Sequence, residues 1–122
     1  MSGLRILIAD DEPIIRETLR DLLEGEGFRV VGMVGDGNEV VRAASELHPD
    51  VVLVDVRMPV VNGIEATRRI LAVHPKTRVI TLSAYDDPAL ASSARAAGAV
   101  DYIAKGTPSR ELIERIRGSA PA

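Results

Sequence analysis

The stretch VVLVDVRMP, residues 51–59, places four aliphatic residues directly before an aspartate, with a proline four positions beyond Asp55. An apolar run without polar alternation is typical of a strand that is buried on both faces of a parallel sheet. A carboxylate is costly in such surroundings unless it has a partner. The stretch therefore predicts a central strand, and it raises the question of what Asp55 does at the end of it.

Four other apolar runs occur along the chain, and their starts are spaced by roughly 22 to 27 residues, with helical patterns between them. Strand and helix alternate five times, which predicts parallel strands with right-handed crossovers and helices on both faces. We expect an α/β fold, a doubly wound five-stranded parallel sheet of strand order 2-1-3-4-5. The run at 51–54 should be central and the run at 28–34, which contains Arg29 and Gly32, should lie at an edge. The other runs are LRILIA (4–9), FRVVGMV (28–34), RVITLS (78–83) and VDYIA (100–104).

Turn and cap residues agree with this pattern. Asp36 followed by Glu39 resembles a capping box, while Asp87-Pro88 and Thr107-Pro108 resemble an N-cap with a proline in the first turn of a helix. Glycines stand where helices are expected to end, at Gly25, Gly27 and Gly98.

The composition is that of one globular domain. The chain has 122 residues, of which 46% are hydrophobic and 27% charged, and its net charge of -3 gives no general reason to bind nucleic acid or an anionic membrane. It contains no cysteine and no segment long and apolar enough to span a bilayer, so we expect a cytoplasmic protein without a membrane partner. We assign residues 1–118 to the domain and 119–122 to a tail or the start of a linker.

Polar side chains follow four of the five runs, at the point where each expected strand ends. Ligands of doubly wound sheets bind at this edge, where the strand order reverses. The first and third strands are neighbours at that point, so the acids that follow them should converge. These polar residues are Asp10, Asp11 and Glu12 after the first run, Asp55 after the third, Ser83 at the end of the fourth and Lys105 after the fifth.

Three carboxylates at one place destabilise a fold unless a cation joins them. Mg²⁺ suits Asp10, Asp11 and Asp55, because it takes hard oxygen ligands and keeps several waters. The lack of histidine and cysteine around these positions argues against zinc. The sequence therefore predicts a magnesium site at the carboxyl edge of the sheet.

Lys105 adds a positive charge to this edge. A carboxylate, a metal ion and an ammonium group together form a cradle for a transferred phosphoryl group, with Asp55 as the nucleophile that becomes an acyl phosphate. Each residue also has a plainer interpretation. Asp11 could cap the following helix, Ser83 could be a loop hydroxyl bonded to the backbone, and Lys105 could be an ordinary surface lysine. Because all these residues are expected at the same edge of the sheet, the interpretation as a phosphoryl-binding site is favoured over separate plain roles.

The same residues lie in stretches that resemble the response-regulator receiver domains of bacterial two-component systems, in the order and spacing of that family. The resemblance covers nearly the whole chain. It implies phosphorylation by a sensor histidine kinase and no enzymatic activity beyond the domain's own phosphorylation and dephosphorylation. The stretches are ADDEP (9–13), LVDVRMPVVNG (53–63), VITLSA (79–84) and GAVDYIAKG (98–106).

The resemblance also implies a role for each site residue. Asp55 is the phospho-acceptor, and Asp10, Asp11 and the backbone carbonyl of Arg57 hold Mg²⁺ with it. Lys105 pairs with the phosphoryl group.

In the same family, Ser83 hydrogen-bonds a phosphoryl oxygen and Tyr102 is the aromatic switch residue. Pro59 and Gly63 shape the loop after the third strand. Phosphorylation is then expected to change the surface of residues 87–117, on which a dimer mate or an output domain docks. The plainer interpretation of Tyr102 is a strand residue packed on the edge of the sheet.

The motif VRMPVVNGIEATRRI, residues 56–70, and the absence of proline after Lys105 are most similar to receivers of NarL/LuxR-type transcription regulators. Many relatives have a proline after the lysine with a cis bond, so Gly106 leaves the isomer of the Lys105–Gly106 bond open. No helix-turn-helix output lies in these residues. We expect either a receiver of a longer transcription regulator or a stand-alone receiver, and no direct nucleic-acid binding by this chain.

Two other functions are possible for a chain of this pattern. A phosphatase of the haloacid dehalogenase type also carries an aspartate after an apolar strand, but it needs a second acid two residues later, where this chain has Arg57. A flavodoxin-like flavin carrier cradles a phosphate in its first loop, and the acidic DDEP at 10–13 would repel one. The chain also has only two tyrosines and one phenylalanine to stack on a flavin.

Overall fold

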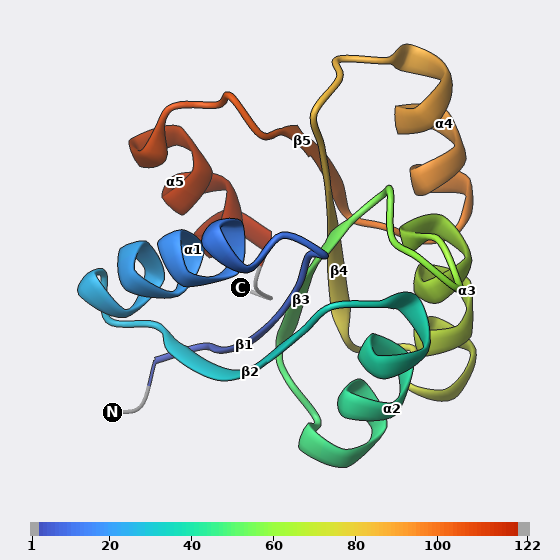
Figure 1. Ribbon diagram of the computed structural model, residues 1–122, viewed down its shortest axis with the longest axis horizontal. Coiled ribbons are helices and arrows are strands. Elements are labelled where there is room, and N and C mark those ends of the chain that lie inside the picture. The colour runs from blue at the N-terminus through green and yellow to red at the C-terminus, as the bar shows by residue number, and fades with distance from the viewer. Residues whose placement is uncertain (1–2, 120–122) are drawn as a thin grey trace.

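The computed structural model describes residues 3–119, in which five strands alternate with five helices (Figure 1). The strands are β1 (Arg5–Ala9), β2 (Arg29–Val34), β3 (Val51–Asp55), β4 (Arg78–Ser83) and β5 (Asp101–Ala104). The helices are α1 (Pro13–Gly25), α2 (Gly37–Leu47), α3 (Gly63–Val73), α4 (Pro88–Ala96) and α5 (Ser109–Ser119).

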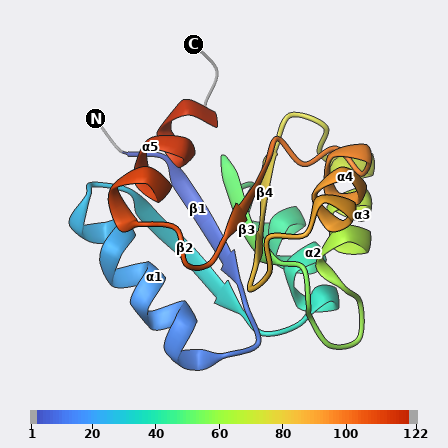
Figure 2. The same ribbon diagram turned by 90° about the horizontal axis from the view of Figure 1, so that it is seen from above.

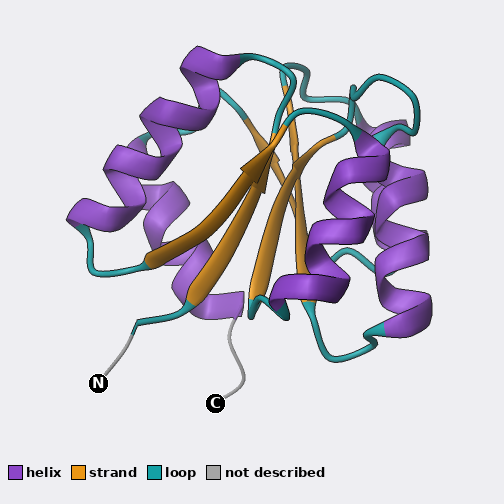
Figure 3. Cartoon of the chain, turned by 60° about the horizontal axis from the view of Figure 1, so that its bottom comes forward, coloured by secondary structure: helices purple, strands orange, loops and turns teal. Residues whose placement is uncertain are grey.

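The strands form one sheet with helices on both sides of it (Figure 3). All pairs are parallel and the order is β2-β1-β3-β4-β5, which confirms the predicted topology. β3 lies in the centre and all five of its residues are buried, as its unbroken apolar pattern predicts. β2 lies at one edge and β5 at the other. The switch in strand order therefore falls between β1 and β3, where Ala9 is paired with Val54, directly before the two acids that follow.

Helices cover both faces of the sheet. α1 and α5 lie side by side on one face, and α2, α3 and α4 cover the other (Figure 2). On the α1/α5 face the core consists mainly of leucine and isoleucine, whereas valine and alanine are more frequent under α2 and α3. A third, smaller cluster lies under α4 and consists of Val56, Ala94, Ala99 and Tyr102.

Helix boundaries follow the predicted caps with one exception. Asp36 and Asp87 cap α2 and α4 by accepting hydrogen bonds from backbone amides. The predicted cap at Thr107 is wrong: the amide of Thr107 still donates to the carbonyl of Ala104 at 3.0 Å in a turn, and α5 begins at Ser109, one residue after the predicted first residue, Pro108.

α1 ends at Gly25, and the two glycines that follow helices, Gly27 and Gly98, adopt positive φ angles of 89° and 107°. An L-residue with a Cβ would be strained in that conformation. α5 extends to Ser119, so this residue belongs to the helix rather than to the predicted tail, and residues 120–122 lie outside the described part of the chain. None of the helices in residues 3–119 is long and apolar enough to cross a bilayer.

Candidate functional site

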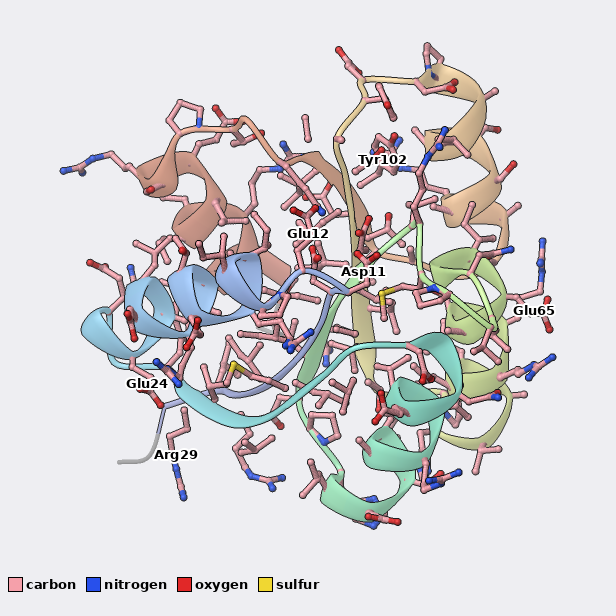
Figure 4. All side chains as sticks on the ribbon, viewed as in Figure 1. Asp11, Glu12, Glu24, Arg29, Glu65 and Tyr102 are labelled. Carbon is pink, nitrogen blue, oxygen red and sulfur yellow. The ribbon has the colours of Figure 1, made fainter. Side chains whose placement is uncertain are left out.

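The three predicted acids meet at the carboxyl edge of the sheet. Asp10 follows β1, Asp11 is next to it, and Asp55 is the last residue of β3. One carboxylate oxygen from each lies within 4.8 Å of the others, which confirms their predicted convergence. Asp10 and Asp55 are buried and Asp11 is exposed, and Figure 4 shows Asp11 over the ends of the central strands.

Lys105 reaches this cluster from the loop after β5. Its Nζ lies 2.7 Å from Asp10 Oδ2 and 3.0 Å from Asp55 Oδ2, and its backbone amide donates to the carbonyl of Ser83 at 2.7 Å. Its side chain is only 19% exposed, so it is not an ordinary surface lysine. The Lys105–Gly106 bond is trans, as are the other described peptide bonds.

Burial and charge together determine the ionisation of the site. Burial raises the pKa of Asp55 above its ordinary value, and the hydrogen bonds from Lys105 and from the Arg57 amide only partly offset this. Burial by itself would lower the pKa of Lys105, but its contacts with Asp10 and Asp55 outweigh that effect and raise the pKa. The ammonium group is therefore protonated at neutral pH. The hydrogen bonds to the ionised Asp55 carboxylate do not fully offset the free-energy cost of its burial.

Asp10 has one oxygen that suits a further ligand. Its Oδ1 accepts a hydrogen bond from the Glu12 amide at 2.9 Å. Its Oδ2 is fully buried and forms an ion pair with Lys105 Nζ at 2.7 Å that is not aligned as a hydrogen bond. A buried carboxylate oxygen without an aligned donor, beside two more carboxylates, fits a hard cation such as Mg²⁺. The cluster can therefore hold a metal ion.

Asp11 does not cap α1, contrary to its plainer interpretation. The N-cap residue of that helix is Glu12, and no side chain accepts a hydrogen bond there. Asp11 makes no ion pair or hydrogen bond with any residue of the described chain. It also lines an open groove that runs past Arg57 and Met58 toward Leu90 on α4. Its carboxylate is thus free to bind a ligand that enters from solvent.

Ser83 and Tyr102 both contact the backbone of Tyr85, in the loop after β4. Ser83 Oγ accepts a hydrogen bond from the Tyr85 amide at 3.1 Å, which agrees with the plainer interpretation of a hydroxyl bonded to the backbone. The Tyr102 hydroxyl donates to the Tyr85 carbonyl at 2.7 Å, and its ring is buried against α4 (Figure 4). The side chain of Tyr85 is exposed and lies under the guanidinium of Arg57. One loop residue therefore connects both predicted switch residues.

The loop after β3 carries the backbone of Arg57. Its amide donates to Asp55 Oδ1 at 3.1 Å. Further along, the Val61 amide donates to the Pro59 carbonyl at 2.8 Å and Val60 has a φ of 70°, which makes a γ-turn. A β-branched residue in this region costs on the order of 1–3 kcal/mol and persists only where the surroundings impose it.

Two residues that support the site could not be identified from the sequence. Arg16 lies on α1, and its guanidinium donates to the backbone carbonyl of Asp10 at 2.7 Å. Gly37 begins α2 and packs against the loop after β3. Nothing in an amphipathic helix pattern distinguishes Arg16 from its neighbours, and a glycine after a cap residue is common. Gly63 was expected to shape this loop, and a Cβ at that position would collide with the Asp55 carbonyl.

Similarity to known proteins extends over almost the whole chain. The family model of the response regulator receiver domain matches residues 6–117. The chain is 37% identical to the uncharacterized transcriptional regulatory protein YxjL of Bacillus subtilis, and the aligned region covers 96% of this chain and 54% of YxjL. It is 36% identical to the chemotaxis protein CheY of Thermotoga maritima, and this aligned region covers 93% of the chain and 95% of CheY.

Solved structures give the same result. The receiver domain of NarL from Mycobacterium tuberculosis superposes on this chain with a TM-score of 0.92 at 28% identity. The superposition covers 97% of this chain and 96% of the NarL chain. A LuxR-family response regulator from an Aurantimonas species superposes with a TM-score of 0.92 at 36% identity, over 96% of this chain and 84% of that one. The chain spans about half the length of YxjL and of the GacA response regulators that it matches. It belongs to the family of response-regulator receiver domains of two-component systems.

Proposed function

We propose that this receiver accepts a phosphoryl group on Asp55 from a sensor histidine kinase and that Mg²⁺ is the required cofactor. One observation carries the proposal: Asp10, Asp11, Asp55 and Lys105 form one charged cluster at the switch point of the sheet. Membership of the receiver family favours this function over the phosphatase and the flavin carrier.

In the proposed reaction, a carboxylate oxygen of Asp55 attacks the phosphorus atom of the donor. The P–N bond of a phosphohistidine breaks, and its electron pair returns to the imidazole nitrogen as the acyl phosphate forms. Bound Mg²⁺ would neutralise the phosphoryl oxygens, held by Asp10, Asp11, Asp55 and the carbonyl of Arg57. Hydrolysis of the acyl phosphate by water restores the Asp55 carboxylate and releases inorganic phosphate. We propose no enzymatic activity of the chain beyond this phosphorylation and dephosphorylation of itself.

Lys105 supplies the positive charge that the protein itself brings to the reaction. In the described structure its ammonium group is shared between Asp10 and Asp55. A phosphoryl group on Asp55 would bring anionic oxygens to the same place, and Lys105 would pair with one of them. Positioning and charge neutralisation account for most catalysis of phosphoryl transfer, so this small set of groups can suffice.

The output of the reaction would pass through Ser83 and Tyr102. If the Ser83 hydroxyl turns to a phosphoryl oxygen, it releases the Tyr85 amide, and the loop that also anchors the Tyr102 hydroxyl is then free to move. The surface of residues 87–117 would change and would bind an output domain or a dimer mate. We propose that the output regulates transcription through a DNA-binding domain outside these residues, in the cytoplasm, without direct nucleic-acid binding by this chain.

Mass spectrometry after incubation with acetyl phosphate and Mg²⁺ tests the acceptor. The wild type should gain the mass of one phosphoryl group, and Asp55→Asn should gain none. Undiminished labelling of Asp55→Asn would contradict the assignment. Steady turnover of an added phosphomonoester by the wild type would favour the phosphatase instead.

The relay is tested with beryllofluoride and Mg²⁺, a stable mimic of the phosphoryl group. Amide shifts should spread to residues 87–117 in the wild type and remain near Asp55 in Ser83→Ala. If Ser83→Ala shows the same distant shifts as the wild type, Ser83 is not the relay.

A further inference from the structure

The loop between β3 and α3, residues 56–62, is held by backbone contacts at both ends. Near β3, the Val56 amide donates to the Leu82 carbonyl at 2.9 Å, and the Val56 carbonyl accepts from the Gly63 amide at 2.9 Å. These contacts fix the base of the loop. Its outer part, which contains the strained Val60, is also in contact with a second helix, α2.

Gly37, the first residue of α2, contacts the outer part of the loop directly. Its amide donates to the Pro59 carbonyl at 3.3 Å, so that carbonyl accepts from Gly37 as well as from Val61. Gly37 is buried, and a Cβ at this position would collide with the backbone carbonyl of Val61 and lie 2.7 Å from its Cβ. Two of these atoms belong to the backbone, so a side-chain rotation cannot relieve the collision.

The requirement for glycine at this position is one of space. Among the described glycines only Gly27 and Gly98 have a positive φ, so Gly37 has a backbone conformation that an alanine would adopt without strain. An alanine is also the better helix former. Local preferences therefore favour alanine at position 37, and the close approach of α2 to the loop after β3 is what opposes it.

We propose that Gly37 is a positioning residue for the metal and phosphoryl site, and that α2 holds the Arg57 backbone in place through the γ-turn at residues 59–61. This inference rests on the proposed function, because it concerns the Mg²⁺ that the cluster would bind. The chain of contacts is continuous: Gly37 holds Pro59 and Val61, and the same short loop carries Arg57, whose amide donates to Asp55 Oδ1. Displacement of the loop would move the Arg57 carbonyl and the Asp55 carboxylate together.

Gly37→Ala tests the proposal, with Gly118→Ala as the matched control. Gly118 is also helical, and nothing lies within 4 Å of a Cβ placed there. We expect Gly37→Ala to weaken Mg²⁺ binding about tenfold, as is common when an outer partner of a metal site is disturbed, and Gly118→Ala to leave it unchanged. The readout is the Mg²⁺ dissociation constant from calorimetric titration, with a thermal melt of each metal-free variant.

The outcomes separate a positioning role from a structural one. A lower melting temperature of Gly37→Ala with an unchanged Mg²⁺ dissociation constant would overturn the proposal. If Gly37→Ala does not fold, the wild type decides: its Gly37 amide resonance should shift with Mg²⁺ at the concentration that saturates the site, while that of Gly118 should not. A Gly37 amide unaffected by bound Mg²⁺ overturns the proposal. Failure of the wild type to bind Mg²⁺ would instead refute the proposed function.

Discussion

The α1/α5 face of the sheet and the layer under α4 are packed in different ways. On the α1/α5 face, large side chains such as Leu23 and Ile116 are fully buried against strand residues that are themselves isoleucine and leucine. α4 has nine residues, and Ala94 is the only one of them that is buried. Because hydrophobic stabilisation scales with the apolar area removed from water, α4 contributes far less to it than α1 or α5.

The weakly packed layer is also the one that contacts the predicted switch. Tyr102 belongs to the cluster under α4, and its hydroxyl holds the loop that contains Tyr85. Elements that move in regulation come from the least stable parts of a fold. The well-packed face can therefore keep the domain folded while α4 and its preceding loop change position. Two experiments would test this difference, and two more would test the charged site next to it; they follow from the largest expected effect to the smallest.

Truncation of a core side chain on the α1/α5 face should be the most costly change. Ile116→Ala should lower the free energy of unfolding by about 2–5 kcal/mol, because the cavity that it leaves adds to the lost burial. Leu90→Ala on α4 should cost about 1 kcal/mol, because Leu90 is only partly buried. Urea denaturation measures both. Equal losses for the two variants would show that α4 is packed as firmly as the opposite face.

Removal of the Tyr102 hydroxyl should have a smaller effect. Tyr102→Phe keeps the buried ring but loses the hydrogen bond to the Tyr85 carbonyl, which should cost about 1 kcal/mol. Amide hydrogen exchange in the loop after β4 and in α4 should become faster, while exchange in α1 stays the same. Tyr85→Phe is the matched control, since its exposed ring lies 5.0 Å from the Arg57 guanidinium and its stability should change by less than about 0.5 kcal/mol. If exchange became equally fast in Tyr85→Phe, loss of the Tyr102 hydrogen bond would not be the cause of the faster exchange.

Protonation of Asp55 should make the metal-free protein more stable as the pH falls. Its pKa in the folded state is raised mainly by burial, so the folded state binds the proton more tightly than the unfolded state. The ionised form therefore destabilises the fold at neutral pH, and this destabilisation disappears as the pH falls through the folded-state pKa toward the ordinary value of 3.8. Compared with Asp55→Asn, the wild type should gain stability over that range. A relative loss over the same range would contradict the raised pKa.

Asp11 should matter least to the stability of the metal-free protein. It is exposed and has no ion pair among residues 3–119, so Asp11→Asn should change the free energy of unfolding by less than about 0.5 kcal/mol. The extra stability that Mg²⁺ confers on the wild type should nevertheless fall in Asp11→Asn. Glu17→Gln is the control, because Glu17 is an exposed acid on the following helix α1, and it should keep the full response. A variant that melts earlier without metal would show that Asp11 has a structural role after all.

Much of this fold could be predicted from short-range patterns. The unbroken apolar run at 51–54 predicted the central strand, and residues at the ends of the runs predicted which side chains meet at the site edge. The predicted start of α5 was wrong because Thr107 and Pro108 match a cap pattern locally, whereas the chain is still in the turn that follows β5. Cap preferences are a local property, and the path of a loop after a strand is not.

The sequence by itself determined the number of strands and helices and the edge at which the acids gather, because burial on a sheet or helix face imposes a period on the chain. It also predicted the order of the strands, because the unbroken apolar run at 51–54 marks a central strand and the run with Arg29 and Gly32 marks an edge strand. Only the tertiary structure decided that Asp10 is buried and Asp11 exposed, although the two are adjacent and chemically identical. It also decided that Lys105 pairs with both Asp10 and Asp55, and that Gly37 touches the loop after β3. These contacts join residues far apart in the chain, and their distances depend on how helices and loops pack on the sheet, which no local period encodes.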